Sequence, residues 1–129
     1  MLPDGKLYNG RSCNAVTSRE GATVNSVEVL RDGVVSRGVL LDVARTRGVP
    51  WLEAGAGVMP EDLEAAEQAA GVRVESGDIL LVLTGYYGRR LAEGPVNPLK
   101  AGNPALHAAC CPWLRERGVA RSARIPTTM

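Results

Sequence analysis

The sequence contains one histidine, His107, in 129 residues, and this scarcity limits the metal chemistry that the chain can perform alone. Three cysteines are present, and two of them, Cys110 and Cys111, are adjacent. This pattern does not predict a disulfide framework, nor a zinc site, which needs spaced cysteines and further ligands. We therefore expect free thiols in a reducing compartment.

The sequence also lacks a large excess of positive or negative charge, and it lacks long apolar runs. The net charge is +1, from 15 basic and 14 acidic residues, so no charge field indicates a nucleic-acid or anionic membrane partner. The longest apolar runs, such as Ile79 to Leu83, are too short to span a bilayer. Nothing near Met1 resembles a secretory signal. These absences predict a cytoplasmic protein without nucleic-acid or membrane partners.

What is present fits a globular domain. The chain is 45% hydrophobic and 22% charged, which argues against a disordered protein, and its length suits one domain. Residues 1–32 have many turn-forming residues and little periodicity, so they predict an irregular arm. An arm of this length is unusual in a compact domain, which suggests that the surface it packs against is absent or comes from elsewhere.

Two strands and one helix are predicted in the next part of the chain. Val34–Val43 is rich in aliphatic and β-branched residues and predicts a strand, with a short helical turn expected at 42–47. Pro60–Ala70 predicts the clearest helix, followed by Gly71 at the position that favours a left-handed backbone. Asp78–Thr84 predicts a second buried strand.

The following segment predicts a loop and a second helix. Tyr86–Lys100 is rich in glycine and proline and is expected to be a loop. A helix is expected to begin at Pro104, to be kinked by Pro112 and to end at Gly118. Leu106, Cys110 and Leu114 are expected on its inner face.

The end of the chain does not read as a core strand. Two strands are too few for a core, so a third should follow the last helix. Residues 121–129 are instead polar, basic and interrupted by Pro126. The element order predicts an α/β domain, and we divide it into the arm (1–32), a strand-helix-strand-helix core (33–118) and an aberrant tail (119–129).

Few self-contained catalytic motifs are present. Gly55-Ala56-Gly57 does not complete a dinucleotide-binding fingerprint, and no serine lies in a nucleophile elbow. His107 and Cys111 are i, i+4 neighbours, but a packed thiol beside an exposed imidazole explains them more simply than a catalytic dyad. The helical carboxylates are interpreted as a solvated face that complements the helix dipole. They are Glu61, Asp62, Glu64 and Glu67.

Four stretches in a fixed order resemble one protein family over about residues 4–120. The first resembles the family's turn D-G-x-x-Y-N-G and the second its strand G-V-V-S-R-G-V-L-L-D-V. The third resembles its strand G-D-I-L-L-V-x-T-G and the fourth its helix L-H-A-x-C-x-x-W-L-x-E-R. They begin at Asp4, Gly33, Gly77 and Leu106.

This family comprises cyclases, kynurenine formamidases and isatin-hydrolase-like enzymes. The resemblance implies a swivelling β/β/α fold and hydrolysis of amide or lactam C–N bonds by a divalent metal, zinc or manganese, through metal-activated water. The family's metal segment, H-x-G-T-H-x-D-x-x-x-H, would precede Asp4, so no metal ligand can be assigned to this chain. We therefore expect an incomplete fold, with the N-terminal metal-binding segment and the C-terminal strands missing.

The resemblance also implies a role for His107, the histidine of the L-H-A motif, near the substrate cavity. The alternative is a histidine that caps a loop carbonyl at the start of a helix. Where the family continues into a strand after Ala120, the tail departs from it, as a shifted reading frame near that codon would produce.

The resulting hypothesis is an arylformamidase-like hydrolase that is inactive as this chain alone. Its substrate would be a small amide or lactam of the N-formylkynurenine or isatin type. Alternatives are a non-catalytic binding or assembly module that pairs with another chain, and an inert pseudogene product. Exposed sheet edges predict a homo-oligomer or association with another chain.

Overall fold

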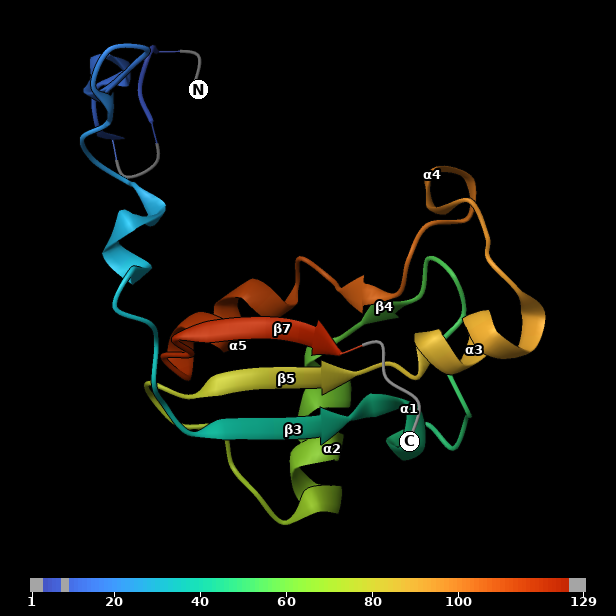
Figure 1. Ribbon diagram of the computed structural model, residues 1–129. Helices are drawn as coiled ribbons and strands as arrows, with labels where there is room; N and C mark the ends of the chain where they lie inside the picture. The colour runs from blue at the N-terminus through green and yellow to red at the C-terminus, as the bar shows by residue number, and fades with distance from the viewer. Residues whose placement is uncertain (1–3, 8–9, 126–129) are drawn as a thin grey trace. The chain divides into compact units, whose positions relative to one another are not determined.

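The computed structural model describes residues 4–7 and 10–125 and divides the chain into two compact units, Met1–Val35 and Ser36–Met129 (Figure 1). The expected arm, residues 1–32, lies in the first unit. Apart from its first few residues, the expected core lies in the second unit, together with the tail. Each unit is described by itself below.

The first unit consists of turns and very short elements. Hydroxyl groups begin its helical turns, since Ser12 and Ser26 each accept a hydrogen bond from a backbone N–H two residues further on. None of its described residues is buried, so apolar burial contributes little to its stability. Its two 3₁₀ helices are η2 (Cys13–Ala15) and η3 (Val27–Leu30). Its two strands, β1 (Val16–Thr17) and β2 (Gly21–Ala22), pair antiparallel.

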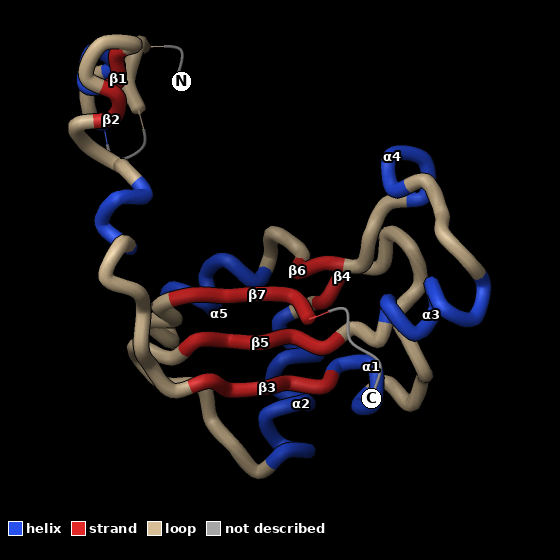
Figure 2. The backbone as a smooth tube through the Cα atoms, in the orientation of Figure 1, coloured by secondary structure: helices blue, strands red, loops and turns tan. Residues whose placement is uncertain are grey.

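The second unit is organised around a three-stranded parallel sheet in the order β3-β5-β7 (Figure 2). Both strands that the aliphatic runs predict are confirmed, because β3 and β5 lie within the predicted ranges. The bounds are β3 (Gly38–Asp42), β5 (Ile79–Leu83) and β7 (Arg121–Ile125). Parallel strands joined through helices confirm the α/β class.

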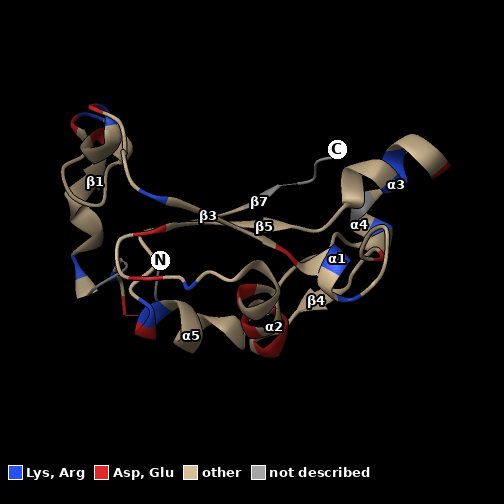
Figure 3. Cartoon of the chain, turned by 90° about the horizontal axis from the view of Figure 1, so that it is seen from below, with Lys and Arg blue, Asp and Glu red and all other residues tan. Residues whose placement is uncertain are grey.

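Helices cover one side of this sheet, with α1, α2 and α5 (Cys110–Glu116) below the strands in the view of Figure 3. The predicted helix at Pro60–Ala70 is confirmed as α2, and Gly71 ends it in the left-handed conformation with φ 65°. The predicted turn after β3 is confirmed as α1 (Val43–Thr46), which Asp42 caps by accepting the N–H of Arg45 at 2.9 Å. No helix in the described ranges is long and apolar enough to cross a membrane.

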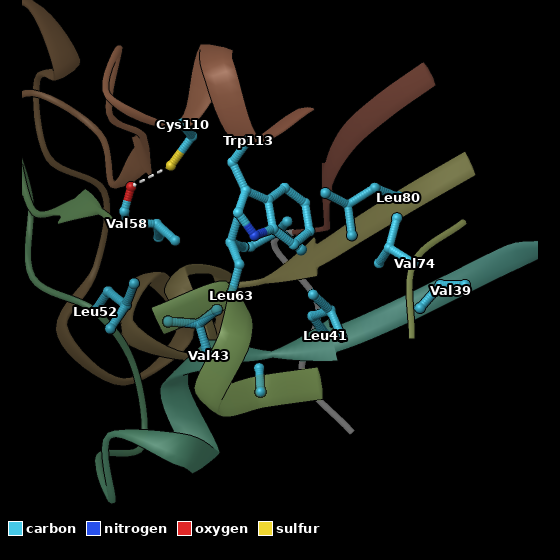
Figure 4. Packing of buried hydrophobic residues seen from close by; sticks show 12 residues of the cluster. Val39, Leu41, Val43, Leu52, Val58, Leu63, Val74, Leu80, Cys110 and Trp113 are labelled. Carbon is cyan, nitrogen blue, oxygen red and sulfur yellow. Dashed lines mark hydrogen bonds between the residues drawn. The ribbon is translucent and has the colours of Figure 1, made fainter. Parts of the chain in front are cut away.

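The core lies between the sheet and these helices (Figure 4). Leu41 of β3, Leu80 of β5 and Leu63 of α2 have no exposed surface, and burial of each such side chain stabilises the fold by about 1.5–3 kcal/mol. Trp113 of α5 points into the same cluster. The buried cluster comprises Val39, Leu41, Val43, Leu52, Val58, Leu63, Ala66, Val74, Leu80, Val82, Cys110 and Trp113.

The expected loop at Tyr86–Lys100 is wrong, because two helices lie in this segment. They are α3 (Tyr86–Glu93) and α4 (Pro98–Ala101). Of the glycines and prolines that suggested a loop, Gly94 follows α3 and Pro98 begins α4, whereas Gly88 lies within α3. Composition alone does not distinguish a helix breaker from a helix terminus.

The expected helix from Pro104 is wrong in its first turns. Its first residues instead form β6 (Ala105–Leu106), which pairs in parallel with β4 (Gly57–Val58), and the helix α5 spans Cys110–Glu116. Pro112 therefore lies in the first turn of α5, where a missing N–H removes no helical hydrogen bond, so the predicted kink has no cause. The predicted end near Gly118 is confirmed.

The tail does form a strand, although its described side chains at 121–123 are exposed and none belongs to the core cluster. Residues 121–125 form β7, which pairs with β5 from Ile79↔Arg121 to Leu83↔Ile125. The chain enters this register because Ala120 N–H donates to the Asp78 carbonyl at 3.0 Å. A free edge of β5 would leave backbone groups unpaired, and this demand overrides the polar composition of the segment.

The sheet face opposite α2 and α5 remains partly uncovered within the second unit. Leu40 is 40% exposed, and its neighbours Ile79 and Leu81 are half-buried. Helices α1, α2 and α5 lie on the other side (Figure 3).

Candidate functional site

A cavity lies near the carboxyl end of β5, beside β7 and β6. This is the edge at which open α/β sheets commonly bind ligands. Its volume is about 240 Å³. The six lining residues are Val82 and Thr84 at the end of β5, Ala105 and Leu106 of β6, and Ser122 and Ala123 of β7.

Thr84 supplies a hydroxyl group without a protein partner. The residue is fully buried, and Oγ1 has no hydrogen-bond partner among the described residues. Its backbone carbonyl is satisfied, because it accepts the N–H of Leu52 at 2.8 Å. Buried hydroxyl groups are usually hydrogen-bonded, so the unpaired Oγ1 is unusual, but Thr84 has no exposed surface and the hydroxyl is enclosed by protein.

Gly85 makes the turn that ends β5 at this point. Its φ is 66°, and a Cβ atom here would lie 2.4 Å from the Pro50 carbonyl oxygen and 2.9 Å from Trp51 Cα. The loop that contains Pro50 and Trp51 therefore packs directly against the backbone of Gly85. Only glycine meets both requirements, a left-handed backbone and no side chain.

His107 directly follows Leu106, a cavity residue, but is not itself part of the cavity lining. Its backbone N–H donates to the Val58 carbonyl at 2.9 Å, and its Nδ1 accepts the Ala109 N–H at 3.2 Å. Acceptance at Nδ1 places the proton of the neutral ring on Nε2. The residue is exposed, so Nε2–H is available as a donor to a ligand or to water.

The alternative that His107 caps a loop carbonyl at the start of a helix holds in a modified form. The imidazole does cap the chain just before α5, but it accepts a backbone N–H and does not donate to a carbonyl. A cap and a substrate-contacting role are compatible here, because they use different ring nitrogens.

The two adjacent cysteines lie in different environments. Cys110 is fully buried and donates its S–H to the Val58 carbonyl at 3.1 Å, and burial raises the pKa of its thiol. Cys111 is exposed. No hydrogen bond joins either thiol to the imidazole of His107 among the described residues, so a Cys–His dyad has no geometric support.

The interpretation of the helical carboxylates as a solvated face is wrong for Glu67. This side chain is buried, accepts the Val74 N–H at 2.6 Å and pairs with Arg117 at 3.0 Å. Asp62 pairs with Arg47 through its Nε at 2.7 Å and accepts the Met59 N–H at 2.7 Å, and the guanidinium lowers the pKa of Asp62. Both carboxylates are structural.

The described residues do not fit the divalent metal that the family resemblance implies. Over residues 4–7 and 10–125, no three histidine, cysteine, aspartate or glutamate side chains gather in an arrangement that could hold a metal ion. The best-placed carboxylates already bind guanidinium groups and backbone N–H groups. No chemical step through a metal is therefore derived for this chain.

Sequence reasoning missed Thr84 and Ser122 as site residues. The available signal for Thr84 was a hydroxyl residue followed by glycine at the end of an apolar strand, the position where parallel strands present ligand-binding groups. Ser122 gave no signal, because its segment was not expected to be a strand.

Comparison with known proteins finds a matching family and a similar solved structure. The sequence pattern of the family described as "Putative cyclase" matches residues 11–123. A solved structure described as the crystal structure of a novel cyclase superposes with a TM-score of 0.75 at 28% identity. The similarity covers 92% of this chain and 40% of that one, so the chain spans less than half of that structure's length. A comparison with curated proteins finds no match.

Proposed function

Because the chain belongs to the cyclase family, we propose that it forms part of a hydrolase that cleaves amide or lactam C–N bonds with the help of zinc or manganese. The observation that carries this proposal is the family match over residues 11–123, together with the four ordered motifs of the sequence. The swivelling β/β/α fold is proposed on the same basis. The substrate class proposed is an N-formyl aromatic amine or an aromatic lactam.

The metal ligands of such an enzyme must come from outside the described residues. The cyclase structure that superposes on this chain is longer, with 40% of its length matched, so a protein of that length has room for a further segment. We therefore expect this chain alone to be inactive. A cytoplasmic location is proposed with this function, as the composition suggests.

The test of this proposal compares two proteins. The first is this chain, and the second is a protein extended by the coding sequence upstream of Met1, if an in-frame H-x-G-T-H-x-D stretch is found there. We expect stoichiometric zinc or manganese and release of free amine from an N-formyl arylamine only in the second protein. An extended protein that binds the metal but cleaves neither formamide nor lactam would contradict the proposed reaction.

His107 is proposed as a residue that positions the substrate or moves a proton in the extended enzyme. His107→Asn keeps a side-chain oxygen that can accept the Ala109 N–H, but it removes the second ring nitrogen. We expect kcat to fall about 10²-fold or more in this variant with unchanged thermal stability. Unchanged kcat would assign His107 to the cap alone.

A non-catalytic binding or assembly module is the second candidate. Two observations favour it: the described residues do not fit a metal, and the sheet face around Leu40 is uncovered within its unit. Such a module would associate as a homo-oligomer or with a separately encoded metal-bearing chain. Light scattering of the purified chain tests the homo-oligomer, and a strictly monomeric protein over a wide concentration range would contradict it.

A further inference from the structure

We infer that Cys110 is a positioning residue for His107, because its buried thiol holds the turn that keeps the imidazole as a hydrogen-bond donor at Nε2. In this role His107 donates to an acceptor group of a ligand, such as a carbonyl oxygen, and does not remove a proton. The inference rests on the proposed function only in its last step, the contact between His107 and a substrate. The state of the ring is tested without a metal and without turnover.

The Val58 carbonyl oxygen binds both ends of the turn that carries the imidazole, residues 107–110. The backbone N–H of His107 donates to this oxygen at 2.9 Å, and the Cys110 thiol donates to the same atom at 3.1 Å. The Cys110 N–H also closes the turn on the His107 carbonyl at 2.9 Å. Val58 and Cys110 have no exposed surface, so water does not compete for the thiol hydrogen bond.

This turn determines the proton position of the ring through Ala109. The Ala109 N–H lies between the two anchored residues in sequence and donates to Nδ1 of the imidazole at 3.2 Å. A neutral ring that accepts a hydrogen bond at Nδ1 carries its proton on Nε2. The lone pair of Nδ1 is then occupied, and the protonated Nε2 has none. The neutral ring therefore offers a ligand one N–H donor and no free acceptor for a proton.

Gly57 of β4 provides the space in which the ring lies. A Cβ atom at position 57 would lie 3.5 Å from His107 Cβ and 3.6 Å from Cδ2, so the imidazole packs against this part of the backbone. The Gly57 carbonyl accepts a hydrogen bond from Arg47 Nη2 at 3.0 Å, and Arg47 Nε pairs with Asp62 at 2.7 Å. The backbone on which the ring packs is thus itself held by an ion pair.

A fixed Nε2–H group favours polarisation of a ligand over proton transfer. A neutral imidazole that donates to a carbonyl oxygen stabilises the negative charge that develops there during attack on the carbon. His107 is exposed, yet both its backbone and its ring are held by contacts. A side chain that is ordered before the ligand arrives loses less conformational entropy on binding.

Core packing alone is the competing explanation for Cys110, because this residue belongs to the buried cluster. The two explanations differ in what they predict for the imidazole. A packing role predicts a change in stability with an unchanged ring. A positioning role predicts a change in the ring that depends on whether residue 110 carries a donor.

The experiment determines the tautomer and the position of the ring by NMR in the full chain, prepared without a histidine tag. His107 is the single histidine of the sequence, so its ring signals are unambiguous. The spectra are recorded at about pH 8.5, where imidazole rings are ordinarily neutral. We expect an unprotonated Nδ1, a protonated Nε2 and a nuclear Overhauser contact from the proton on Cδ2 to the Gly57 Hα protons.

Two variants of Cys110 separate packing from positioning. Cys110→Val keeps an apolar side chain but removes the donor, and we expect the Nδ1-protonated fraction of the ring to rise at least about 3-fold, the effect of a modest hydrogen bond. Cys110→Ser keeps a donor but is more polar, and should retain the wild-type ring even where it lowers the unfolding midpoint. A packing role predicts an unchanged ring in both variants.

A pair of Gly57 variants tests the place of the ring independently of the thiol. Gly57→Ala adds a Cβ atom at ordinary contact distance from the imidazole and should leave the tautomer unchanged. Gly57→Val needs space that the ring occupies, and should displace the imidazole and raise the Nδ1-protonated fraction. Equal rings in these two variants would contradict the packing of the imidazole on β4.

Two results would overturn the role of Cys110. The first is a wild-type ring that is protonated at Nδ1. The second is a folded Cys110→Val protein whose ring matches that of the wild type, which would reduce Cys110 to a core residue. If Cys110→Val does not fold, Cys110→Ala is compared with Cys110→Ser in its place. Failure of hydrolysis in the extended enzyme would refute the proposed function and leave these ring measurements unchanged.

Discussion

At the scale of single residues, two positions are constrained by their immediate surroundings. Gly85 has a left-handed backbone pressed against the loop at Pro50, and Cys110 holds a buried thiol against a carbonyl. In both cases the constraint comes from a segment distant in sequence. Substitution and chemical modification test each one.

Gly85→Ala should strongly destabilise the protein. A Cβ atom 2.4 Å from the Pro50 carbonyl oxygen forces the backbone to shift, and the left-handed conformation adds about 1–2 kcal/mol of strain. We expect a total loss above about 3 kcal/mol, measured by urea unfolding. The control is Gly71→Ala, which has φ 65° but no atom within 4 Å of the added Cβ and should show the strain alone. Equal losses in the two variants would contradict the packing argument.

Cys111 should react with iodoacetamide much faster than Cys110. The Cys111 side chain is exposed, whereas Cys110 is buried, donates to the Val58 carbonyl, and has a pKa raised by burial, so it stays protonated at neutral pH. Peptide mass spectrometry after a short native treatment measures the ratio. In denaturant both thiols should react at similar rates. Equal labelling in the folded protein would refute the buried thiol.

At the scale of secondary-structure elements, an ion pair joins the N-terminal ends of β3 and β5. Asp78, just before β5, accepts hydrogen bonds from Arg37 Nε at 2.8 Å and Nη2 at 2.7 Å, and from the Glu75 N–H at 2.7 Å. Arg37 immediately precedes β3, and its N-terminal neighbour Ser36 donates to the Gly77 carbonyl. These contacts align the two strands in register.

Protein stability should depend on pH through Asp78. The Arg37 guanidinium, with help from the Glu75 N–H, lowers the pKa of Asp78 to about 2 from an ordinary value of 3.8. The unfolded state therefore binds the proton first, so the stabilisation is complete above about pH 4 and is lost as the pH falls towards 2.

Asp78→Asn tests this dependence. Unfolding by urea at several pH values should show a smaller stability loss between pH 4 and pH 2 in the variant than in the wild type. Glu75→Gln is the matched control, since this carboxylate is mainly exposed and its ion pair with Arg37 contributes little. An unchanged pH profile in Asp78→Asn would show that other carboxylates carry the effect.

At the scale of the whole molecule, stability is concentrated in the second unit. The buried cluster lies entirely within residues 36–129, and no described residue of the first unit is buried. Removal of residues 1–35 should therefore lower the unfolding free energy by less than about 1 kcal/mol and keep a cooperative transition. Circular dichroism during thermal unfolding measures this. Loss of the cooperative transition would show that residues 1–35 are needed to cover apolar surface of the second unit.

Local pattern was enough to predict the α/β class, two strands and the longest helix. Aliphatic runs predict β3 and β5 as strands, although only one face of β3 is buried and Leu40 is 40% exposed. Helix α2 is signalled by Pro60 at its start and Gly71 at its end. The family resemblance is confirmed by the match over residues 11–123, and two of its four motifs coincide with β3 and β5.

The formation of β7, β6 and the cavity depends on tertiary structure and could not be predicted from local sequence. Arg121–Ile125 becomes a strand because β5 offers it unpaired backbone groups, a demand that its own residues do not reveal. Cavity volume and the unpaired hydroxyl of Thr84 depend on how β5, β6 and β7 meet, and no sequence window contains all three. The sequence by itself determined which segments are apolar enough to form a core, whereas long-range pairing decided which polar groups remain free within it.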